Sequence, residues 1–131
     1  MNIVRIVARI FLGIVFLVAG GFSFFISNPP PQPGMAGAFN TIFVHSHWSL
    51  FVGAAQVVIG VLLLINRYVP LALTLLFGFV YNSFAFHITM APIALPAPVL
   101  VTILGLTVAW PYRALFAHLF AAQPRVEPPA E

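Results

Sequence analysis

The fold is decided by one apolar stretch that a short polar turn divides in two. From Gly53 to Leu75 the chain reads GAAQVVIGVLLLINRYVPLALTL, in which Arg67 is the only charged residue. Proline lacks a backbone donor and suits the first turn of a helix, so Pro70 begins a second helix shortly after the first ends near Ile65. Each half belongs to a longer apolar run, at about 47–65 and 70–89, that is long enough to predict a membrane crossing, and together the two runs predict a helical hairpin.

The rest of the chain is equally apolar. Of its 131 residues, 62% are hydrophobic and 5% are charged, whereas soluble domains carry about 25% charged residues. Lys, Asp and Cys are absent, and the first acidic residue is Glu127. This composition excludes an ordinary cytosolic domain, extensive disorder, disulfide scaffolds and thiol–disulfide catalysis. It also leaves a Ser-His-Asp hydrolase without its acid and a proton-coupled exporter without a membrane carboxylate.

The charges divide the chain into spans. Uncharged segments of 57 and 45 residues run from Ile10 to Asn66 and from Tyr68 to Tyr112, and each can hold two crossings of about 20 residues with a loop between them. Backbone groups in lipid must be satisfied internally, so the crossings are expected to be helices. We therefore predict an all-α membrane protein, a four-transmembrane-helix bundle that forms one domain over residues 1–122. Its helices are expected at about 3–26, 47–65, 70–89 and 98–112, followed by a short interfacial helix at about 113–122 and a disordered tail at 123–131.

The arginines predict the orientation. Arg5, Arg9, Arg67 and Arg113 fall on the same side of four crossings, and basic residues favour the cytoplasmic side. Both termini are therefore expected in the cytoplasm. The first helix is expected to be retained and not cleaved as a signal peptide, because its apolar run continues to Ile26. A net charge of +3 that comes mainly from interfacial arginines predicts no nucleic-acid partner.

Small and polar residues recur at helical spacing in all four predicted helices. Lipid is as apolar as leucine, so helices associate through close packing at small residues and through polar contacts. These stripes are expected to be the inward faces of the bundle: Gly13, Gly20, Ser23 and Ser27; Ser49, Gly53, Gln56 and Gly60; Thr74, Gly78, Asn82 and Ala85; and Thr102, Gly105 and Ala109.

Two amides stand out within these stripes. At about 1.5 Å per residue, Gln56 lies about 14 Å and Asn82 about 10 Å from the outer ends of their helices. The two side chains are predicted either to bond each other or a buried backbone carbonyl, a contact worth about 0.5–2 kcal/mol in a bilayer, or to bind the carbonyl of a quinone.

Three of the four histidines are expected near the outer face. His45 and His47 begin the second helix, His87 lies near the outer end of the third, and His118 is on the inner side. The trio is a candidate metal site, although His45-x-His47 is not the zinc-protease spacing. One alternative is haem ligation, for which only His87 lies clearly inside a membrane helix. Another is hydrogen bonding or proton transfer to a quinone. In the last, the histidines lie at the interface and bond only water, lipid headgroups or backbone, or in the case of His87 the side chain of Ser83.

Three stretches follow one another along the chain: Ala8–Gly20 with the Pro-rich loop after it, Gly53–Leu75, and Asn82–His87 followed by Ala91-Pro92, Leu95-Pro96, Tyr112-Arg113 and Phe116. Together, in this order, they resemble the DoxX-like membrane proteins. The resemblance implies a four-helix protein of the bacterial inner membrane, linked to membrane redox systems and named after a small subunit of a terminal quinol oxidase. Asn82 and His87 match the Asn and His of the family's third helix. Relatives often carry a polar or basic residue where this chain has Gly21-Phe22-Ser23, which favours an accessory role here.

The sequence therefore predicts a small accessory subunit of a membrane oxidoreductase or respiratory assembly, without independent enzymatic activity. Its expected partners are lipid and larger redox subunits or further copies of itself. A quinone is its expected cofactor, with Gln56, Asn82 and His87 as contacts. A stand-alone haem- or metal-binding redox protein and a small-solute carrier or channel remain alternatives.

Overall fold

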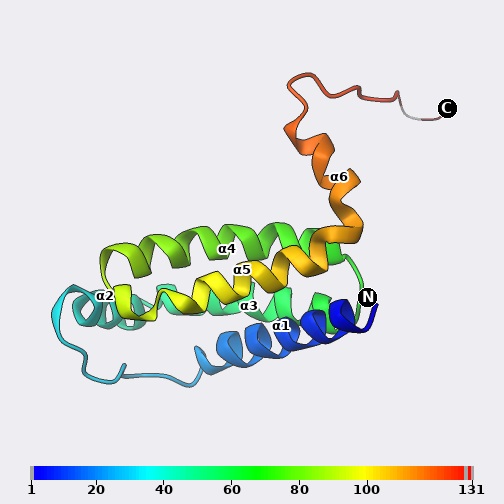
Figure 1. Ribbon diagram of the computed structural model, residues 1–131. Coiled ribbons are helices and arrows are strands. Elements are labelled where there is room, and N and C mark those ends of the chain that lie inside the picture. The colour runs from blue at the N-terminus through cyan, green and yellow to red at the C-terminus, as the bar shows by residue number, and fades with distance from the viewer. Residues whose placement is uncertain (1, 129, 131) are drawn as a thin grey trace.

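The computed structural model describes residues 2–128 and 130, and every regular element in that part of the chain is a helix. The long helices pack side by side, and the N-terminus and the start of α6 (Arg113–Ala117) lie at the same end of the molecule (Figure 1). The long helices are α1 (Asn2–Phe22), α3 (Trp48–Leu64), α4 (Val69–Thr89) and α5 (Pro96–Ala109).

The four long helices form a closed ring of contacts. α1 packs on α3 and α5, and α4 packs on the same two helices from the other side. By length and apolar composition, α1, α4 and the continuous stretch Pro92–Phe120 can each cross a membrane. The helix α2 (Gly34–His45) together with α3 adds a fourth span if this bent pair counts as one. The all-helical membrane fold is confirmed, while the count of four spans and the cytoplasmic termini remain predictions.

The core is made of large aliphatic side chains. Phe16 meets Phe79 edge-on, with ring centroids 5.2 Å apart, so α1 and α4 touch across the middle of the bundle. The largest fully buried side chains are Leu12, Ile59, Leu63, Leu73 and Leu76.

Glycines bring α1 and α3 into backbone contact. A Cβ added to Gly20 would lie 2.5 Å from the carbonyl oxygen of Gly53, and one added to Gly60 would lie 2.7 Å from that of Gly13. Only glycine permits such an approach, as expected where helices associate in lipid. These four glycines, called the glycine seam below, belong to the predicted stripes of both helices.

The predicted inward stripe of α4 is wrong. Thr74, Gly78, Asn82 and Ala85 are exposed, while the buried face consists of larger residues such as Leu73 and Leu76. The polar members need no neighbouring helix: the Thr74 hydroxyl donates to Pro70 O at 2.9 Å and the Asn82 amide to Gly78 O at 3.0 Å. Back-bonding within the helix removes the reason to bury them.

The turn after α3 ends that helix with hydrogen bonds. Asn66 adopts left-handed geometry (φ 56°), its amide bonds Leu63 O at 3.3 Å, and the Arg67 amide bonds Leu62 O at 3.2 Å. This is a Schellman motif with asparagine where glycine is usual. The guanidinium of Arg9 donates to the carbonyl oxygen of Leu63, so α1 places a positive charge at the negative end of the α3 dipole.

The first helix ends earlier than predicted. α1 stops at Phe22 instead of about Ile26, because the next residues form tight turns in which the Ser23 amide bonds Gly20 O and the Phe25 amide bonds Phe22 O. Two consecutive glycines, Gly20 and Gly21, weaken the helix at this point.

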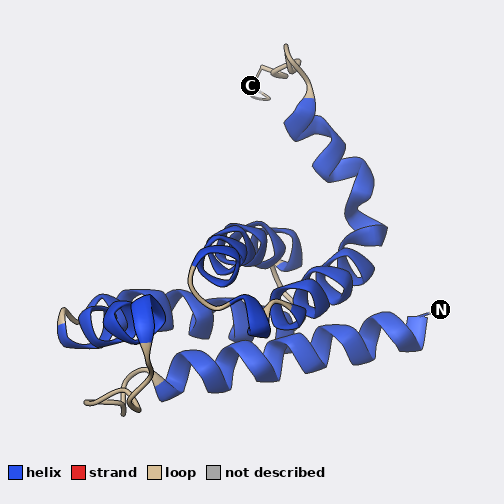
Figure 2. Cartoon of the chain, turned by 60° about the vertical axis from the view of Figure 1, so that its left-hand side comes forward, coloured by secondary structure: helices blue, strands red, loops and turns tan. Residues whose placement is uncertain are grey.

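The segment expected to be a long loop contains an extra helix, α2 (Gly34–His45). It begins after Pro33 and meets α3 at 83°, and the sharp bend is made at His47, which has φ 63°. We refer to this end of the bundle as the α2 end and to the opposite one, which carries Arg9 and Arg67, as the arginine end. Figure 2 shows the arrangement from a second side.

The chain leaves the bundle after α5. The 3-10 turn η2 (Trp110–Tyr112) leads into α6 (Arg113–Ala117) and η3 (His118–Phe120), which project away from the four helices in Figure 1. The short helix predicted at about 113–122 is therefore present but ends at Phe120, and its position at a membrane interface remains a prediction. Of the predicted tail, residues 129 and 131 lie outside the described residues, and 123–128 contain no helix.

Candidate functional site

A large cavity lies at the α2 end, between α2, α3 and α4. Its volume is about 830 Å³, within the range of about 300–1,000 Å³ that is typical of small-molecule sites. All three residues predicted as quinone contacts, Gln56, Asn82 and His87, line it. None of the described residues that line it carries a formal charge.

Aromatic rings build the wall of the cavity at the α2 end. Phe39 stacks on Phe43 with centroids 5.6 Å apart, and it meets Phe86 of α4 at 5.3 Å. Trp48 packs edge-on against Phe43 at 5.6 Å. Sequence reasoning missed the contribution of Phe39 and Phe43 because α2 was expected to be loop, although Met35, Phe39, Ile42 and Phe43 already recur at helical spacing.

The two amides share the cavity without bonding each other. The Asn82 amide nitrogen donates to Gly78 O of its own helix, and among the described residues no hydrogen bond joins it to Gln56. Within the same residues the side-chain oxygen of Asn82 accepts no hydrogen bond, and the Gln56 side chain neither donates nor accepts one. Both side chains can therefore still bond a molecule in the cavity.

Within the part of the chain that the structure describes, His87 is the cavity residue with a buried polar atom that lacks a hydrogen-bond partner. Its Nδ1 is buried and has no hydrogen-bond partner among the described residues, and Ser83 does not supply the predicted bond. Buried polar atoms are almost always paired. With Nδ1 unpaired, no neighbour fixes the tautomer of the ring, so its other nitrogen can either donate or accept. The ring rests edge-on against Phe86, with centroids 5.2 Å apart.

The remaining histidines lie elsewhere. The His45 ring nitrogen is 3.4 Å from the side-chain oxygen of Asn28, and His47 occupies the bend between α2 and α3. Neither lines the large cavity, and the described residues contain no group of three or more potential ligands that could hold a metal ion. The structure therefore does not bring His45, His47 and His87 together, and it gives His87 no second histidine for haem ligation. His118 lies in η3, outside the bundle.

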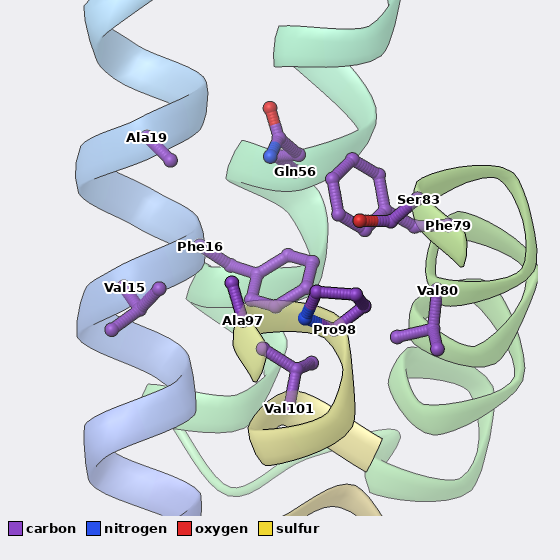
Figure 3. A pocket seen from close by; sticks show the side chains of 10 residues that line it. All are labelled: Val15, Phe16, Ala19, Gln56, Phe79, Val80, Ser83, Ala97, Pro98 and Val101. Atoms are coloured by element: carbon purple, nitrogen blue, oxygen red, sulfur yellow. The ribbon is translucent and has the colours of Figure 1, made fainter. Parts of the chain in front are cut away.

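A smaller cavity of about 140 Å³ lies deeper, where α1, α3, α4 and α5 meet. Figure 3 shows its wall of apolar side chains, with Gln56 and Ser83 as the polar members. Gln56, Phe79 and Ser83 line both cavities. The Gln56 amide thus stands where the large cavity meets the centre of the bundle.

These features define a class of protein: a small helical membrane protein with an uncharged, aromatic-walled cavity at one end of its bundle. The comparison with protein families matches residues 4–88 to DoxX, which is more than half of the chain. The chain belongs to the DoxX family. The comparisons with curated proteins and with solved structures found no significant match.

Proposed function

We propose that this DoxX protein is a small accessory subunit of a membrane oxidoreductase or respiratory assembly, and that it borders a quinone site. The observation that carries the proposal is the large cavity, in which Gln56, Asn82 and His87 face a space walled by aromatic rings. A quinone needs hydrogen bonds at its carbonyl oxygens and flat apolar contacts at its ring. The cavity supplies both, since the Gln56 amide can donate, His87 can donate through its ring, and Phe39, Phe86 and Trp48 offer aromatic surfaces.

The chain itself supplies little for electron transfer. It has no cysteine and no acidic residue before Glu127, so thiol chemistry and carboxylate proton relays are not available within its membrane helices. When a quinone is bound, the quinone supplies the redox chemistry. The residues named above orient its ring, and the aromatic wall limits the access of water. Electrons would come from or go to a partner subunit.

The outer surface of the bundle suits contact with such a partner or with lipid. Tyr81 is 76% exposed, Ile88 61% and Ile93 94%, and exposed apolar faces of this kind mark contact with membrane or protein. We infer a bacterial inner-membrane location from the DoxX family, and cytoplasmic termini from the positions of the arginines.

Extraction from native membranes in a mild detergent, followed by native separation, tests the accessory role. We expect the chain to migrate with redox subunits and to retain quinone. In a His87→Leu variant the retained quinone should fall, while His118→Leu, which changes a histidine outside the bundle, should leave it unchanged. A chain that always migrates free of redox subunits would refute the accessory role.

A further inference from the structure

The large cavity is an elongated groove along α3 and α4. Its lining runs from Trp48 to Ile59 on α3, and from Leu75 to Thr89 on α4 with Met90 directly after that helix. At about 1.5 Å per residue, these stretches are about 16–22 Å long. The groove therefore extends from the α2 end well into the middle of the bundle, much farther than a single ring needs.

The chemistry of the lining changes along its length. His87 and Thr89 lie near the α2 end, Asn82 and Ser83 follow one turn deeper, and Gln56 is the deepest polar member on α3. Beyond them the wall is apolar and ends at Ile59 and Leu75. A ligand that satisfies both parts has a polar head at the α2 end and an apolar tail that points toward the arginine end.

One side of the groove is open to the surroundings of the bundle. Gly78 and Ala55 are exposed on facing helices, and Leu75 is 40% exposed. A Cβ added to Gly78 would have no neighbour within 4 Å. On the opposite side of α3, the glycine seam closes the contact with α1. A molecule dissolved in the membrane can therefore reach the groove between α3 and α4.

The head of the ligand must be uncharged. Among the described residues no Arg lines the groove, and the sequence contains no Lys, so a phosphate or carboxylate head would be desolvated without a counter-charge. The aromatic wall at the α2 end instead suits a flat ring.

We propose that the groove binds a neutral, long-tailed lipid with a planar head, held with its head between Trp48 and His87 and its tail beside Gly78, and that this lipid passes between α3 and α4 from the membrane. The inference rests on the proposed function and specifies its ligand, which is a membrane-resident quinone whose tail the protein itself contacts. A water-soluble quinone would fill only the head section.

Tryptophan fluorescence gives a direct test, because quinones quench it at short range. The chain has two tryptophans, and Trp48 lines the groove while Trp110 lies at the start of η2 near the arginine end. The full chain with Trp110→Phe is titrated in phosphatidylcholine nanodiscs with a decyl-tailed benzoquinone and with its tailless dimethoxy-methyl counterpart. We expect saturable quenching with both, and only non-saturating quenching of Trp110 in a Trp48→Phe protein.

The decisive comparison adds two variants. Gly78→Leu fills the part of the groove beside Gly78, where the tail is proposed to lie, and its Cβ has no neighbour within 4 Å among the described residues. Gly21→Leu is the control, because its Cβ is equally free of neighbours but lies on α1, away from the groove. Gly78→Leu should weaken the decyl quinone about tenfold, or about 1.4 kcal/mol, and leave the tailless quinone unchanged, while Gly21→Leu should change neither. Equal effects of Gly78→Leu on the two quinones, or no effect on either, would overturn the tail assignment but leave the head site standing. A lack of saturable quenching with both quinones would refute the quinone site and this inference together.

Discussion

The glycine seam allows a sharp test of what holds α1 against α3, since two adjacent glycines of α1 lie in opposite environments. In Gly20→Ala the new methyl group would lie 2.5 Å from Gly53 O and 2.8 Å from the Val57 nitrogen, both backbone atoms. To bring the first distance to an ordinary contact of 3.4 Å, the helices must separate locally by about 0.9 Å. The methyl group of Gly21→Ala would meet no atom within 4 Å beyond its own stretch of helix backbone, among the described residues.

Overpacking of this kind costs about 1–3 kcal/mol, and the better helix propensity of alanine returns at most about 1 kcal/mol. We therefore expect Gly20→Ala to lower the free energy of unfolding by about 1–2 kcal/mol and Gly21→Ala to leave it unchanged or raise it slightly. The measurement is unfolding in mixed detergent micelles, followed by circular dichroism. Gly13→Ala should cost less than Gly20→Ala, because its closest contacts are side-chain atoms of Leu64, which can move. Equal stabilities for Gly20→Ala and Gly21→Ala would show that the seam does not hold the helices together.

Further predictions concern the arginine end, the turn and the topology. Arg9→Met should lower the free energy of unfolding by about 1.5–3 kcal/mol, the usual worth of a hydrogen bond to a charged group. Arg5→Met should have a smaller effect, because Arg5 makes no side-chain hydrogen bond to the described residues, whereas Arg9 does. Equal effects of the two substitutions in the same unfolding assay would argue against the contact of Arg9 with the end of α3. Because Asn66 has left-handed backbone geometry, Asn66→Gly should leave the free energy of unfolding unchanged, and Asn66→Ala should lower it by about 1–2 kcal/mol. A higher melting temperature for Asn66→Ala than for Asn66→Gly would contradict this. The chain has no cysteine, so single cysteines can map the topology: Ser27→Cys should react with an impermeant maleimide in intact cells, and Gln123→Cys only after permeabilisation. Reaction of both from outside would refute the cytoplasmic C-terminus.

The sequence predicts the long helices well because their signals are local. Uninterrupted apolar runs and prolines such as Pro70 place α3 and α4 within about two residues at each end. The glycines of α1 and α3 are also placed correctly, because a backbone contact across lipid leaves glycine few substitutes. The stripe on α4 misleads for a physical reason: Asn82 bonds its own helix, so its polarity reports nothing about a neighbouring helix.

The site is harder to predict from the sequence than the fold. Gln56, Asn82 and His87 can be singled out as rare polar residues among apolar ones, and the structure does place them around one cavity. The aromatic wall depends on α2, whose glycines and weak helix formers hide it in a proline-rich segment. The openness of the groove depends on the spacing of α3 and α4, which no local pattern encodes.

The central claim is that a quinone binds between α3 and α4 at the α2 end while the protein is part of a redox assembly. Photolabelling of native membranes with a long-tailed azidoquinone, followed by peptide mapping, tests it most directly. The account predicts label on residues 48–59 or 75–90 of this chain, together with label on a redox subunit of the same complex, and both signals should disappear when unlabelled quinone is in excess. Label confined to α1 or α5, or label on this chain that excess quinone does not displace, would contradict it.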